Sequence, residues 1–208
     1  MSNEHNQDTG LWRGAKTLEE LGELTARWIE GDLPYHPCEG GGVYEETKPI
    51  QEVLVFFNKN GLVTTFSQPA EPLDEKGFSQ RACVEGYARE DIAKRIAALG
   101  LYADLLVLIY PPDVEWGYQI PITLSEYQPF TWCGPGWGNE QLEYFKEECS
   151  TEAIESLASA WLVVVIDLQW GRENYLWDHV RHALTNPPAK PFNVTPSPDL
   201  GLDKDFVF

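Results

Sequence analysis

Five polar side chains near the ends of predicted strands are candidates for a ligand pocket. Asp167 follows an apolar run at the end of a predicted strand, the edge where open α/β sheets place ligand-binding groups. Arg172 comes shortly after it, Arg81 and Glu85 share one face of another strand, and Gln68 follows a third. Together they would form a pocket at the sheet edge, in a protein that binds a small nucleotide-like ligand or in an enzyme. Alternatively, Asp167 caps a turn or forms a partly buried ion pair with Arg172 or Arg81, and the strand face with Glu85 points to solvent.

Catalytic and metal-binding motifs are absent from the sequence. The nucleophile motif GxSxG does not occur, and Ser67, the nearest candidate, begins a predicted turn. His179 and His182 lie three residues apart on a predicted helix and His36 is close to Cys38, but no paired-cysteine spacing typical of zinc accompanies them. No phosphate-binding glycine motif is present. We therefore predict no catalytic residue, no metal and no cofactor, and favour binding over catalysis.

The strong negative charge predicts a different kind of partner. The chain has 15 basic and 33 acidic residues and a net charge of −18, which repels nucleic-acid phosphates and anionic membranes. We therefore expect no direct nucleic-acid or membrane binding, and a basic protein as the partner. The alternative is that the charge only promotes solubility.

An aromatic loop and an acidic helix are the candidate surface for that partner. They supply Trp116, Tyr118, Trp132, Trp137, Glu140, Glu143 and Glu147. Large rigid aromatic groups anchor interfaces, and a row of glutamates can imitate the phosphates of a nucleic acid. This favours a non-enzymatic inhibitor, of phage or mobile-element type, that occupies a basic nucleic-acid-handling protein. The alternatives are a small core under the loop and a solvated helix face.

Apolar periodicity and turn residues predict the elements that must position these groups. The predicted helices cover 18–30, 49–59, 90–99, 139–148, 151–159 and 172–184, the strands cover 62–66, 81–88, 105–110, 119–124 and 161–167, and 32–48 and 131–138 are loops. Thr17 and Glu20 form a capping box for the first helix, which Gly31 ends. The strand over 161–167 is expected to be central because it is apolar throughout.

This order of elements predicts an α/β (α+β) fold in one domain over residues 11–185. We expect a mixed sheet of about four to six strands flanked by helices. Residues 1–10 are predicted to be flexible, and residues 186–208 form a proline-rich tail whose phenylalanines suggest docking on the body. The oligomeric state is open.

The absence of export signals predicts a cytoplasmic protein. No apolar run reaches the roughly 18 residues that span a bilayer, and the polar N-terminus has no signal-peptide pattern. The four cysteines are widely spaced, so we expect free thiols in a reducing compartment.

The chain resembles an uncharacterised domain family of unknown function from actinomycete genomes. The resemblance is carried by LWRGAKTLEELGELTARWIEG (11–31), NGLVTTFSQP (60–69), QRACVEGYA (80–88) and AWLVVVIDLQWGR (160–172), and covers most of residues 11–185. The family carries glycine after its Ser-Gln-Pro triplet, whereas this chain has Ala70. The resemblance implies kinship but no activity or site residue.

Overall fold

A computed structural model describes residues 10–112, 114, 119–134 and 138–186, with the backbone alone for 138–142. The predicted flexible N-terminus and docked tail lie almost entirely outside these residues. No helix in the described ranges is both long enough and apolar enough to cross a membrane.

The first helices form as the capping and periodicity signals predict. Helix α2 (Leu18–Glu30) begins at the Thr17–Glu20 capping box and ends at Gly31, whose φ of 87° is the left-handed conformation that glycine favours. The predicted loop over 32–48 and the predicted start of the next helix at Pro49 are wrong in part, because a 3₁₀ turn, η1 (Glu45–Ile50), precedes α3 (Gln51–Lys59). Helix α3 packs against α2.

Four antiparallel strands form the central sheet, in the order β1-β3-β7-β4. They are β1 (Leu62–Gln68), β3 (Cys83–Ala88), β7 (Trp161–Asp167) and β4 (Leu105–Tyr110). The prediction that residues 161–167 form a central strand is confirmed, since β7 pairs with both β3 and β4 and is buried from its second residue onward. Strand β4 is an edge strand and only its first residue is fully buried.

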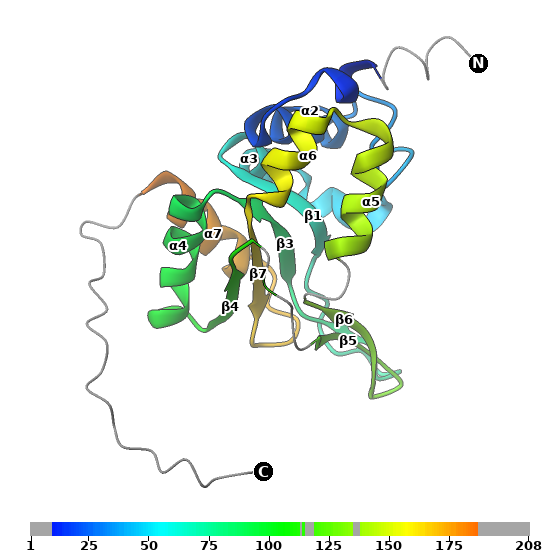
Figure 1. Ribbon diagram of the computed structural model, residues 1–208. Helices are drawn as coiled ribbons and strands as arrows, with labels where there is room; N and C mark the ends of the chain where they lie inside the picture. The colour runs from blue at the N-terminus through cyan, green and yellow to red at the C-terminus, as the bar shows by residue number, and fades with distance from the viewer. Residues whose placement is uncertain (1–9, 113, 115–118, 135–137, 187–208) are drawn as a thin grey trace, which may run out of the picture.

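Helices pack against this sheet near both of its edge strands, β1 and β4. Helix α4 (Glu90–Ala97), its extension η2 (Ala98–Leu101) and α7 (Tyr175–Thr185) pack beside β4 and β7, whereas α2 and α3 pack on β1 (Figure 1). Helix α6 (Thr151–Ala158) contacts α2, and α5 (Gly138–Glu148) precedes it. These contacts bury one continuous core.

A second antiparallel sheet projects away from the helices (Figure 1). It consists of β2 (Ser79–Gln80), β5 (Ile120–Ser125) and β6 (Gln128–Cys133), in the order β2-β5-β6. The prediction of a loop from residue 131 is wrong, because β6 continues to Cys133. Glu126 and Tyr127 join β5 and β6 at positive φ without the Asn-Gly or Asp-Gly pair that usually marks such a hairpin.

The predicted α+β class is confirmed for one domain. In the described part of the chain, the strands form two antiparallel sheets of four and three strands, instead of one mixed sheet. The chain changes sheets at Arg81 and Ala82, where the Arg81 N–H bonds to the Ile122 carbonyl at 2.8 Å and the Asp167 N–H bonds to the Ala82 carbonyl at 2.9 Å. Periodicity reports which residues are apolar, but not such a change of partner.

Candidate functional site

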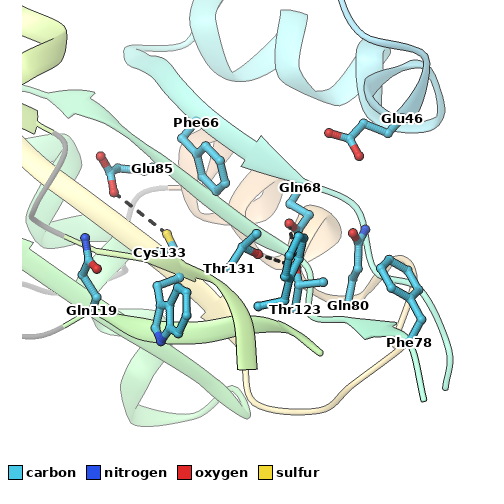
Figure 2. A pocket seen from close by; sticks show the side chains of 12 residues that line it. Glu46, Phe66, Gln68, Phe78, Gln80, Glu85, Gln119, Thr123, Thr131 and Cys133 are labelled. Carbon is cyan, nitrogen blue, oxygen red and sulfur yellow. Dashed lines mark hydrogen bonds between the residues drawn. The ribbon is translucent and has the colours of Figure 1, made fainter. Parts of the chain in front are cut away.

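A cavity of about 750 Å³ lies between the two sheets, with η1 at its mouth. Its lining consists of Glu46, Phe66, Gln68, Phe78, Gln80, Glu85, Gln119, Thr123, Phe130, Thr131, Trp132 and Cys133, and Figure 2 shows how they surround the space. This volume is within the range of roughly 300 to 1,000 Å³ that small-molecule sites occupy. The cavity is therefore large enough for an organic ligand.

Glu85 is the buried acid of this cavity. It lies on β3 opposite Phe66 of β1 and Val164 of β7, and it is only 2% exposed. Its Oε2 is 3.9 Å from the Cys133 Sγ, whereas Oε1 has no hydrogen-bond partner among the described residues. Burial raises the pKa of Glu85 to about 7, although hydrogen bonds from the Gly134 N–H and the Cys133 thiol lower it in part. Such a carboxyl can accept a hydrogen bond from a ligand or exchange a proton with it.

A chain of hydrogen bonds fixes the polar wall of the cavity. The Thr131 hydroxyl donates to Thr123 Oγ1 at 2.5 Å, and the Thr123 hydroxyl donates to Gln68 Oε1 at 3.1 Å. The Gln68 amide in turn donates to the carbonyls of Arg81 and Ile122, each at 3.3 Å. The donors of this chain are thus directed to protein acceptors, and what remains for a ligand is oxygen lone pairs.

The cavity carries negative but no positive side chains. Glu46 is exposed at the mouth and Glu85 is buried inside, and no arginine, lysine or histidine occurs among the described lining residues. The sequence has no basic residue or histidine between Arg95 and Lys146, the stretch that contains β5 and β6. A phosphate in this cavity would therefore meet carboxylates without a compensating cation.

Aromatic rings form much of the remaining wall. Phe66, Phe78, Phe130 and Trp132 line the cavity, and Phe130 and Trp132 on the edge strand β6 are 62% and 43% exposed. Exposed aromatic groups around a hollow are typical of binding sites.

Two thiols lie next to the acid. Cys133 is at the end of β6, and Cys83 is buried on β3 two residues before Glu85. Burial, with the adjacent Cys133 and Glu85, raises the pKa of the Cys83 thiol well above its usual range. Cys83 is therefore protonated and is not an activated nucleophile.

The five predicted pocket residues divide between two places. Gln68 and Glu85 line the cavity together, whereas Arg81 does not. The Arg81 guanidinium lies 4.3 Å from the centre of the Trp170 ring and donates to the Pro121 carbonyl at 3.4 Å. Arg81 therefore connects β5 to the segment after β7.

Asp167 and Arg172 form an ion pair, which is the alternative that the sequence left open. Asp167 is fully buried, and Arg172 donates to its carboxylate through Nη2 at 2.6 Å and Nε at 2.8 Å. Arg172 Nη2 also donates to the Asp104 carbonyl at 2.9 Å, and its guanidinium stacks on Tyr175. The pair links the end of β7 to the loop before β4.

The predicted partner surface is described only in part. Trp116, Tyr118 and Trp137 lie outside the described residues, as does the side chain of Glu140. Trp132 is on β6 and lines the cavity, whereas Glu143 and Glu147 are exposed on α5. The Lys146 ammonium forms an ion pair with Glu143, with 2.5 Å between Nζ and Oε1.

Several cavity residues were not identified from the sequence. Phe66 comes from β1, and three segments that meet in the second sheet supply Phe78, Gln80, Thr123, Phe130, Thr131 and Cys133. The signal in the sequence is the alternation of Phe130 and Trp132 with Thr131 and Cys133, which has the two-residue period of a strand.

The histidine and cysteine positions do not form a metal centre in the described residues. No group of three or more His, Cys, Asp or Glu side chains there is arranged to hold a metal ion. His36 is buried against the rings of Trp12, Trp28 and Phe145. Burial lowers its pKa to about 3, so it is neutral.

A family model described as a domain of unknown function (DUF6919) matches residues 7–187. The match covers most of the chain, and its description assigns no activity, ligand or partner. A search of curated proteins found no match.

Proposed function

The chain belongs to the DUF6919 family of domains of unknown function, and we propose that it binds a small organic ligand in the cavity between its two sheets. The observation that carries this proposal is the buried Glu85, whose Oε1 has no partner among the described residues and whose side chain lines a cavity of about 750 Å³. A buried polar atom without a partner costs roughly 1–3 kcal/mol, which a ligand hydrogen bond would recover. The lack of basic lining residues favours a ligand without phosphate, and so narrows the nucleotide-like expectation.

A cavity-filling substitution tests this proposal. Thr131→Trp would place an indole in the space that Thr131 lines, on a strand where tryptophan is well tolerated. Thr185→Trp is the matched control, because Thr185 is exposed at the end of α7, outside the cavity lining. A ligand-observed NMR screen of neutral, cationic and anionic fragments should find binders of the wild type and of Thr185→Trp. We expect Thr131→Trp to lose them; equal binding by all three proteins would contradict the proposal.

A second candidate function is an acidic protein that binds a basic partner. It is supported by the exposed Glu143 and Glu147 of α5, next to Tyr144, which is 56% exposed. In this second function the protein is an inhibitor of a nucleic-acid-handling enzyme and is encoded by a phage or mobile element of actinomycetes. We place the cavity first because the buried side chains of Glu85, Gln68 and Thr123 line one space, whereas exposed glutamates are by default solvated.

Charge reversal separates the two functions. The double variant Glu143→Lys/Glu147→Lys should abolish salt-sensitive capture of a basic protein from host lysate, while the same reversal at the exposed Glu71 and Glu75 should not. Capture that is unaffected by either reversal would remove the basis of this second function. Fragment binding in the cavity should be unchanged in both variants.

A further inference from the structure

One polar group of the cavity is a buried acceptor beside aromatic rings, and this favours a particular ligand chemistry. The hydroxyl and amide donors of Thr131, Thr123 and Gln68 point to other protein oxygens. Glu85 Oε1 is a buried acceptor without a partner among the described residues. An N–H or O–H donor of a ligand that reaches Oε1 would therefore supply the hydrogen bond that this buried atom lacks.

The charges around the cavity favour a positive ligand. Glu85 is inside, Glu46 is at the mouth, and no basic residue occurs in the sequence from residue 96 to residue 145. The negative faces of aromatic rings attract organic cations, and Phe66, Phe78, Phe130 and Trp132 supply such rings. A carboxylate combined with aromatic rings is an arrangement suited to an ammonium or amidinium group on an apolar body.

We propose that the ligand of this cavity is a small organic cation with several N–H donors, an amine or amidine on an apolar or aromatic body, whose charged group binds Glu85. This inference rests on the proposed function and specifies its ligand class. The charged group donates an N–H hydrogen bond to Glu85 Oε1, the body contacts the aromatic rings, and Glu46 attracts the cation to the mouth. The two carboxyl groups disfavour an anion, because no basic side chain occurs among the described lining residues.

The carboxyl must be ionised to hold a cation, so affinity depends on pH. The titratable groups around Glu85 are Cys83 and Tyr87 on β3, Tyr110 on β4, Cys133 on β6 and, across the cavity, Glu46. Because burial raises the pKa of Glu85 to about 7, it is mostly protonated at pH 6 and mostly ionised at pH 8. Binding of a permanent cation should be about tenfold tighter at pH 8 than at pH 6.

Three probes with the same ring and different head groups test the inference. Benzamidine is a planar cation, benzamide is its neutral analogue and benzoate is the anion. We expect titrations followed by NMR at pH 8 to show benzamidine binding at least tenfold more tightly than either of the others. Glu85→Gln should weaken benzamidine at least tenfold, whereas Glu71→Gln, at an exposed residue outside the cavity lining, should not.

The outcomes distinguish the ligand class from the proposed function. The cation inference is overturned if benzamide or benzoate binds as tightly as benzamidine, or if benzamidine binds Glu85→Gln as tightly as it binds wild type. In either case the cavity is still a ligand site. If none of the three probes binds, the cation inference is overturned, and the fragment screen with Thr131→Trp decides the proposed function separately. If Glu85→Gln does not fold, the pH dependence of the wild type takes its place, and tighter benzamidine binding at pH 6 than at pH 8 would overturn the inference.

Discussion

Replacing Glu85 by glutamine should change how stability depends on pH. In the unfolded chain Glu85 ionises with its ordinary pKa of 4.5, but in the folded protein burial raises the pKa to about 7. The folded state therefore binds more protons between these values, and stability falls as pH rises through this window. At about 1.4 kcal/mol per pKa unit, the full loss is about 3 kcal/mol, most of it between pH 5 and pH 8. Glutamine cannot ionise, so Glu85→Gln avoids this loss.

Urea denaturation at pH 5 and pH 8 measures the effect. The free energy of unfolding of Glu85→Gln, relative to wild type, should increase by about 2–3 kcal/mol from pH 5 to pH 8. Glu71→Gln is the matched control, because Glu71 is exposed, and should stay within about 0.5 kcal/mol of wild type at both pH values. A relative stability of Glu85→Gln that does not change between pH 5 and pH 8 would refute the burial of an ionisable group at this position. A destabilising acid in a cavity is typical of residues kept for function at a cost in stability.

Three further substitutions test the fold. Arg172→Met should lower the free energy of unfolding by about 3–5 kcal/mol, because Asp167 would remain buried without its cation; a loss below about 1 kcal/mol in urea denaturation would contradict this. Gly86→Ala should lower the free energy of unfolding by about 1–3 kcal/mol or more, since the new Cβ would lie 2.4 Å from a carbonyl oxygen of β1. Gly100→Ala, whose Cβ would have its nearest neighbour at 3.8 Å, should lower it clearly less, as measured by thermal denaturation. Between pH 7 and pH 5, the free energy of unfolding of wild type should fall by about 2 kcal/mol relative to that of His36→Gln. The reason is that burial lowers the pKa of His36 to about 3, whereas the histidine of the unfolded chain protonates near 6.5. Parallel pH profiles of the two proteins in urea denaturation would show that His36 is not buried in its neutral form.

Local signals were sufficient to predict most of the elements. The capping box at Thr17 and the glycine at position 31 define α2, and the apolar run over 161–167 identifies the central strand. These features depend on neighbours in the sequence. The exchange of sheets at Arg81 depends on long-range pairing, which no local pattern reports. The hairpin depends on positive φ at Glu126 and Tyr127, which neither residue type favours.

The site was predictable only where a residue lies on a predicted strand. Gln68 and Glu85 were identified because strand periodicity places them at an end or on a mixed face. Arg81 and Asp167 have the same kind of signal, yet the structure uses both in contacts between segments. Sequence alone does not distinguish these roles, because a charged residue at a strand end can be satisfied either by the protein or by a ligand. Thr123 and Thr131 join the site only because β5 and β6 fold over β1 and β3.

The central claim is that a small molecule occupies the cavity between the two sheets. Native mass spectrometry of the full chain, after incubation with a metabolite extract of its host and removal of unbound compounds, tests it most directly. We predict that wild type and Thr185→Trp retain the same compound, and that Thr131→Trp, whose indole fills the cavity, does not. Retention of that compound by Thr131→Trp at the wild-type level would contradict the claim, as would the absence of any retained compound in all three proteins.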